Sequence, residues 1–230
     1  MCYEDTIPED KAAAYLKLAA DRHLPEALAA VGMLEINGDG VLFPVNREQG
    51  MRKLQAALML GYQPAAVTLA SLYMAEPDKH SAESILALYK NAAEQGDARA
   101  MVAYAYCIAT GRGCEADAAK GREMLKTLAF NGMPYASMAL ADLYFNGVGE
   151  APDVRAAVNA LGEAASAGVP QCYTLMAALT ALGTETTKGD ERRAESFLRM
   201  AEENHEQSPR ELYQSLLADK EWHFLPPVQK

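Results

Sequence analysis

This 230-residue sequence lacks the features that direct a chain into or across a membrane. No apolar run approaches the ~20 residues that a helix needs to span a bilayer, so we expect no membrane insertion. The first residues, Met1-Cys2-Tyr3-Glu4-Asp5, contain neither the basic nor the apolar region of a signal peptide. We therefore expect a cytoplasmic protein. The alternative is a periplasmic or secreted protein from which a signal peptide, not present in this chain, has been removed.

Positive charge is scarce. The chain has 21 Lys and Arg against 31 Asp and Glu, which gives a net charge of -10. Binding to nucleic acid requires clustered Lys and Arg to neutralise phosphates, and binding to an anionic membrane surface requires the same. The charge therefore argues against both as partners and predicts no nucleic-acid binding, whereas a protein with a basic surface would be electrostatically favoured.

Motifs for metals, cofactors or catalysis are also missing. There is no C-x-x-C pair, and the histidines are scattered with no i, i+4 pair among them, at His23, His80, His205 and His223. No G-x-S-x-G, H-E-x-x-H or phosphate-binding loop occurs, and Gly111-Arg112-Gly113 is too short to cradle a nucleotide. We predict that the protein is not an enzyme and uses no metal or cofactor.

The sequence instead contains a repeat in a helix-favouring composition, rich in Ala, Leu and Met but only 7% aromatic. A first glycine series recurs at intervals of 35, 36 and 36 residues, at Gly61, Gly96, Gly132 and Gly168. Each of these glycines is expected to close a helix in a left-handed conformation. In the first junction His23 takes this place, and His205 does so near the C-terminus.

A second glycine series has the same period. Gly38-Asp39-Gly40, Gly111-Arg112-Gly113 and Gly147-Val148-Gly149 lie 73 and then 36 residues apart, which is two repeats and then one. Segments of about 12 to 14 residues with helical spacing lie between the two series. Each unit therefore reads as a helix, a glycine-rich turn, a second helix and a tight turn, which predicts an all-α solenoid.

This pattern divides the chain, as a single solenoid domain over 1–230, into five full repeats between two incomplete ends. The predicted repeats are 25–63, 64–97, 98–133, 134–169 and 170–208. Residues 8–24 read as an N-terminal half-repeat, and 209–230, with Trp222, Phe224 and Pro226-Pro227, as a C-terminal cap. Such caps would cover the terminal apolar faces. The alternative is that the chain begins inside a longer array.

The run Ala136-x-x-x-Leu140-Ala141-x-Leu143-Tyr144-x-x-Gly147-x-Gly149 resembles the first helix and turn of Sel-one-like repeats (SLRs), relatives of the tetratricopeptide repeat. Asp153-x-x-Ala156-Ala157 through Ala164-Ala165-x-x-Gly168 resembles the second helix. The resemblance implies an α-solenoid, a right-handed superhelix of tandem antiparallel helix pairs. Members of the family are similar in acting as adaptors or regulators that bind other proteins, often in bacteria.

The cysteines are candidates for redox chemistry, but their register indicates packing. Cys107 and Cys114 fill positions held by a core leucine and a valine in other repeats, and Cys172 fills the position of a small residue. We therefore predict that all three are structural thiols. A local Cys107–Cys114 disulfide is the alternative. For Cys2, a lipid-bearing mature N-terminus is a further alternative.

The resemblance implies that the first helix of each repeat lines a concave face. Positions between the core positions of these helices are unusually apolar and are expected to face solvent. In the third and fourth repeats they form, with neighbouring polar residues, a predicted partner-binding patch: Arg99, Val102, Tyr106, Tyr135, Met138, Asp142, Phe145 and Asn146. An exposed aromatic and methionine patch rimmed by polar residues is typical of an interaction site. The alternative is that tight curvature buries these side chains against neighbouring helices.

We therefore expect a non-catalytic scaffold or adaptor that binds a protein or peptide partner through its concave face, as a monomer or weak dimer. One alternative is an inhibitor or immunity-type protein that neutralises a toxic partner. A second alternative is a regulatory subunit that binds a small ligand in the groove.

Overall fold

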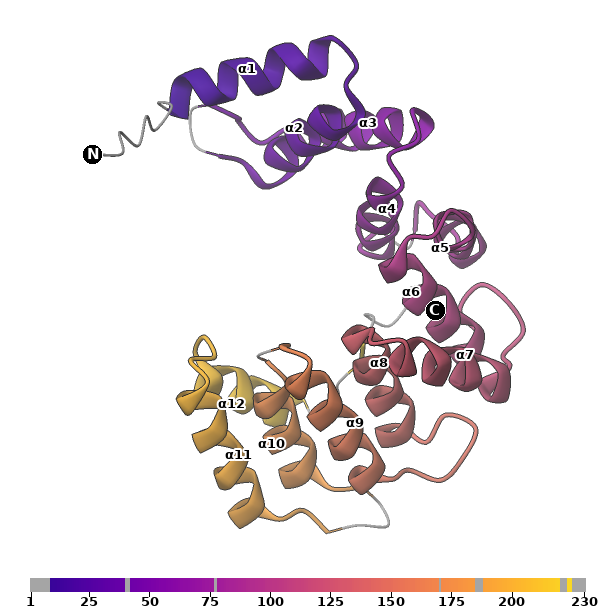
Figure 1. The fold of residues 1–230 in the computed structure, drawn as a ribbon, viewed down its shortest axis with the longest axis vertical. Coiled ribbons are helices and arrows are strands. Elements are labelled where there is room, and N and C mark those ends of the chain that lie inside the picture. The colour runs from indigo at the N-terminus through magenta and orange to yellow at the C-terminus, as the bar shows by residue number, and fades with distance from the viewer. Residues whose placement is uncertain are drawn as a thin grey trace. The chain divides into compact units, whose positions relative to one another are not determined.

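The structure is a computed structural model that describes residues 9–39, 42–76, 78–169, 171–184, 188–219 and 223–224. In these ranges it contains twelve α-helices and no β-strand (Figure 1). In chain order they are α1 (Glu9–Asp21), α2 (Pro25–Asn37), α3 (Arg47–Met59), α4 (Pro64–Met74), α5 (Ala82–Glu94), α6 (Ala98–Thr110), α7 (Ala118–Phe130), α8 (Pro134–Phe145), α9 (Val154–Ser166), α10 (Cys172–Leu182), α11 (Glu191–Glu203) and α12 (Pro209–Asp219). The predicted all-α fold of tandem helix pairs is confirmed.

The chain forms two compact units, Met1–Ala100 and Met101–Lys230. In the first unit, each helix from α1 to α5 packs against the helix that precedes or follows it in sequence. In the second unit, α7 to α11 do the same, and α12 packs against both α10 and α11. No helix in the described ranges is long and apolar enough to cross a membrane.

Left-handed residues close the helices that precede α4, α6, α8 and α10, as the first glycine series predicts. Gly132, for example, has a φ of 82°, and its N–H donates to the Ala129 carbonyl while the N–H of Met133 donates to Leu128. This pair of hydrogen bonds satisfies two carbonyls that a helix end otherwise leaves unpaired. His23 and His205, with φ values of 60° and 57°, adopt the same left-handed conformation at the turns predicted for them.

The second helix of each pair begins at a polar capping residue. The side chains of these residues accept a hydrogen bond from the backbone N–H three positions later; they are Asn46, Ser81, Asp117, Asp153 and Asp190. Each cap typically stabilises a helix by ~1 kcal/mol. The first helices instead begin at proline where the sequence has one, at Pro25, Pro64 and Pro134. The first helix α6 begins without proline and is capped by Asp97, whose side chain accepts from the N–H of Ala100.

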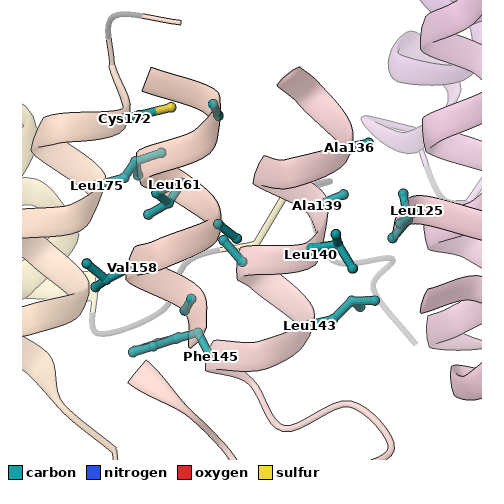
Figure 2. Packing of buried hydrophobic residues seen from close by; sticks show 14 of the residues in the cluster. Leu125, Ala136, Ala139, Leu140, Leu143, Phe145, Val158, Leu161, Cys172 and Leu175 are labelled. Atoms are coloured by element: carbon teal, nitrogen blue, oxygen red, sulfur yellow. The ribbon is translucent and has the colours of Figure 1, made fainter. Parts of the chain in front are cut away.

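Apolar residues fill the space between the helices of the second unit. Figure 2 shows Leu125 of α7, Leu140 and Leu143 of α8 and Leu161 of α9 gathered between neighbouring helices, all of them buried. Gly121 of α7 lies against α6 so closely that a Cβ there would approach the Ala105 carbonyl oxygen to 2.6 Å. A glycine at this contact lets the two helices approach each other at the level of their backbones.

The described cysteines are free thiols. Cys107 and Cys172 are buried, which agrees with their predicted packing role, and Cys114 is partly exposed. The alternative of a Cys107–Cys114 disulfide is wrong. Instead, the Cys114 thiol points toward the Cys107 carbonyl oxygen at 3.9 Å. Cys2, Trp222 and Pro226-Pro227 lie outside the described residues.

Candidate binding site

The predicted partner-binding patch falls on the two units unequally. Arg99 stands at the beginning of α6 in the first unit and is exposed. The other seven residues belong to the second unit, where they lie on α6, on α8 and just after α8. We describe the patch in the second unit only.

The expected exposure of this patch is wrong for half of its residues. Val102, Tyr106, Asp142 and Phe145 are buried. The reason is that α6 and α8 each pack against neighbours on several sides, so that eight of the twelve residues of α8 are buried. The alternative interpretation, burial against neighbouring helices, holds for these four. Tyr135, which is 45% exposed, and Asn146 face solvent, and Met138 is half-buried.

Two of the buried residues form a polar pair between α6 and α8. The Tyr106 hydroxyl donates a hydrogen bond to Asp142 Oδ2, and the Asn146 side chain donates to Asp142 Oδ1. Arg112, in the turn after α6, places its guanidinium 5.0 Å from the centre of the Tyr106 ring. We call Tyr106, Arg112, Asp142 and Asn146 the Tyr106–Asp142 site.

The site holds an ionisable carboxyl away from water. Burial raises the pKa of Asp142, while the hydrogen bond from Tyr106 and the nearby His223 act to lower it. Burial and the negative charge of Asp142 also raise the pKa of the Tyr106 hydroxyl, so Tyr106 stays a donor. A buried carboxylate is stable only with donors or a cation around it. The site is therefore built to accept a hydrogen-bond donor or a positive charge.

The chain itself supplies such groups, from the segment after α12. His223 Nδ1 lies 3.6 Å from Asp142 Oδ1, and the backbone N–H of Phe224 donates to the same carboxylate. The Phe224 ring packs on Tyr106, with a centroid distance of 5.5 Å and a tilt of 57°. The sequence marks this segment only by its aromatic residues, which predict a terminal cap. In the structure, Phe224 contacts Tyr106 of α6.

A second feature of this unit is a pocket of about 630 Å³ between α7, α8 and α9. Its walls include Leu140, Tyr144 and Ala160, and the Ser137 hydroxyl donates to Glu163 at 3.3 Å beside it. Phe130, at its rim, is 92% exposed. The pocket could take an apolar group, and Lys126 and Glu163 in its lining add one charge of each sign. In the described parts of the chain, no three His, Cys, Asp or Glu side chains are placed to hold a metal ion.

No family model and no curated protein matches this sequence. Solved structures do match it. A Sel1 repeat protein from Oxalobacter formigenes superposes with a TM-score of 0.66 at 21% identity, over 86% of this chain and 78% of its own. A Sel1 repeat protein from Klebsiella pneumoniae subsp. pneumoniae gives a TM-score of 0.62 at 16% identity, over 89% and 98% of the two chains. This chain has the Sel1-repeat fold.

A further structure with a similar fold is the immunity protein Pa5087 from Pseudomonas aeruginosa. It matches the Sel1-repeat chain with a TM-score of 0.50 at 15% identity, over 96% of this chain and 79% of its own. At identities this low, the similarity of all three structures concerns the fold. What this Sel1-repeat chain binds therefore depends on the side chains of its own site.

Proposed function

We propose that this Sel1-repeat protein is a non-catalytic interaction scaffold that binds a protein or peptide partner through the face on which its Tyr106–Asp142 site lies. The observation that carries the proposal is the docking of His223 and Phe224 on that site. A site that takes an imidazole–carboxylate contact, a backbone hydrogen bond and an aromatic contact from its own chain has the chemistry to take similar contacts from another protein.

We assign two roles to the residues of the predicted patch. Val102 and Phe145 are core residues that fix the positions of α6 and α8, and Tyr106 and Asp142 form the polar floor of the site. The accessible residues of the second unit, Tyr135, Met138 and Asn146, supply contacts to the partner. A half-exposed tyrosine beside a methionine is common among the residues that contribute most to interfaces.

The charge of the chain favours one kind of partner surface. With a net charge of -10, the protein attracts a basic protein over distances of about a Debye length, ~8 Å at physiological salt. A basic partner also suits a site whose centre is a carboxylate. On the same grounds of charge, the proposal includes no nucleic-acid partner.

The alternative functions have one observation each in their favour. The similarity in fold to the immunity protein Pa5087 supports an inhibitor that neutralises a toxic partner. The pocket of about 630 Å³ supports a regulatory subunit that binds a small ligand, because a pocket of this size suits a drug-sized molecule.

Affinity capture with matched variants tests the proposal. Three baits are used: the full chain, the double variant Tyr135→Ser/Met138→Ser, and Phe130→Ser. Phe130→Ser is the control, because it removes an exposed aromatic residue outside the proposed face. We expect a stoichiometric protein to be recovered by the parent and by Phe130→Ser but not by the double variant. Equal recovery by all three would place the interface elsewhere.

Two further outcomes separate the alternatives. A captured protein whose toxicity is abolished by this chain would identify an inhibitor. A shift of the melting temperature by a metabolite, without any captured protein and abolished by Leu140→Gln in the pocket wall, would identify a regulatory subunit.

A further inference from the structure

The segment after α12 offers the Tyr106–Asp142 site a histidine side chain directly followed by an aromatic one. His223 lies against the Asp142 carboxylate at 3.6 Å, and Phe224 lies against the Tyr106 ring at 5.5 Å. The two contacts use adjacent residues of one chain segment and adjacent groups of one site. The site therefore matches a two-residue motif rather than a single side chain.

Each half of the site favours its half of the motif for a physical reason. The Asp142 carboxyl is 1% exposed, so a cation beside it is poorly screened by water and interacts strongly. Tyr106, which is also 1% exposed, gives the aromatic ring an apolar and aromatic partner from which water is excluded. The Phe224 N–H donates a further hydrogen bond to the carboxylate and so constrains the direction of the segment.

His223 fills its part of the Tyr106–Asp142 site incompletely. The His223 side chain remains 29% exposed, and 3.6 Å lies beyond ordinary hydrogen-bond distance. Histidine carries its charge only when it is protonated, whereas Arg and Lys are charged at neutral pH and have longer side chains. A segment with Arg or Lys in this position would therefore bind better than the chain's own residues.

We propose that the Tyr106–Asp142 site recognises a partner segment in which a cationic residue is directly followed by an aromatic residue, and that His223 and Phe224 occupy the site until such a segment displaces them. This inference rests on the proposed scaffold function and names the partner motif and its competitor. Because His223 follows α12 after three residues, it is tethered close to the site. Short tethers give an effective concentration of about 1 mM, so even weak contacts keep the site occupied.

The test measures binding of labelled peptides by fluorescence anisotropy. The first peptide has the sequence of residues 219–230, the second carries Arg in place of its His, and the third carries Ser in place of both its His and Phe. The proteins are the full chain, the full-length variant His223→Ser/Phe224→Ser, and Phe130→Ser as the matched control. Circular dichroism verifies that the helical content of all three is the same.

We expect the double variant to bind the first peptide at least ~10-fold more tightly than the parent or Phe130→Ser, because the tethered competitor is gone. The Arg peptide should bind more tightly still, and the Ser–Ser peptide should not bind. Equal affinity of all three proteins would overturn occupation by the tail, and binding of the Ser–Ser peptide would overturn the motif. Absence of binding to the double variant would overturn both.

A measurement on the unmodified chain covers the case in which the double variant does not fold. Hydrogen exchange at the Phe224 amide should be slow in the free protein and at least ~10-fold faster when the Arg peptide saturates the site. No change would contradict displacement. If the protection depends on protein concentration, the occupant is the tail of a second copy, which contradicts the tethered arrangement.

The motif inference can be contradicted while the scaffold function still holds. A partner captured through Tyr135 and Met138 by a chain that binds none of these peptides removes the cation–aromatic motif but leaves the scaffold. If no partner is captured but the peptides bind tightly, the cation–aromatic motif remains and the scaffold function is removed.

Discussion

Tyr106 and Asp142 stand 36 residues apart, at the same position of the consecutive first helices α6 and α8, and they are joined by a hydrogen bond between the tyrosine hydroxyl and Asp142 Oδ2. The repeat period alone brings them together, because equivalent positions of stacked helices lie next to each other. Other first helices carry Met33, Ser71 and Ala178 at this position, none of which is ionisable. The pair is therefore a departure from the repeat pattern that creates a polar site within it.

Removal of the Tyr106 hydroxyl should destabilise the fold. In Tyr106→Phe the buried Asp142 carboxyl loses a donor, which typically costs ~1–3 kcal/mol of unfolding free energy. Urea denaturation followed by circular dichroism measures this. Tyr135→Phe is the control, because Tyr135 is exposed, and it should change the free energy by less than ~0.5 kcal/mol. Equal stability of Tyr106→Phe and the parent would show that the hydrogen bond does not contribute.

The raised pKa of Asp142 makes a specific contribution to the pH dependence of stability. Burial is its main cause, so the folded state holds the proton more tightly than the unfolded state does. The stabilisation of the folded state that comes from the raised pKa is fully present below the unfolded pKa, ~3.9. It is lost as the pH rises through the folded pKa. The unfolding free energy of the parent relative to Asp142→Asn should therefore fall from about pH 4 upwards. A difference that grows with pH would show that Tyr106, Asn146 and His223 outweigh burial.

The buried cysteines should resist alkylation. Burial raises the pKa of both Cys107 and Cys172 to about 12, so at neutral pH neither has a reactive thiolate in the folded protein. Iodoacetamide at about pH 8, followed by peptide mass mapping, should label Cys114 at least ~10-fold faster than these two. In denaturant all three should react alike. As the pH rises above ~9, the unfolded thiols ionise first, so stability should decline.

Gly132→Val should damage the fold because of backbone conformation rather than lack of space. Gly132 has a φ of 82°, yet a Cβ there would meet nothing within 4 Å. A β-branched residue in this region is strongly disfavoured, so we expect a loss of ~2 kcal/mol or more and a lower melting temperature. Asn tolerates left-handed conformations, so Gly132→Asn is the matched control and should lose about half as much or less. If the valine variant melts like the parent, the turn has an alternative conformation.

The periodic turn residues made the helical fold predictable. Gly132 and its equivalents end helices wherever the backbone must turn left-handed, which is a local requirement that any sequence with this spacing must satisfy. The capping residues, such as Asp153, were equally local and could have been found by their position ahead of each second helix. The free, buried state of Cys107 followed from its register alone.

The exposure of the candidate site could not be predicted in the same way. A helical period shows which residues share a face, but α6 and α8 are packed on more than one face, so the positions between the core residues are also buried. The occupation of the site was equally hidden, since His223 lies 81 residues after Asp142 and no local pattern connects the two.

The sequence by itself determined the helices, their ends and the all-α fold, because caps and left-handed turns depend on neighbouring residues within a few positions. Only the tertiary structure decided which side chains of the first helices are buried, and that His223 lies against Asp142. Those relationships depend on how helices stack and where the segment after α12 lies. They are set by long-range packing, and no period in the sequence predicts them.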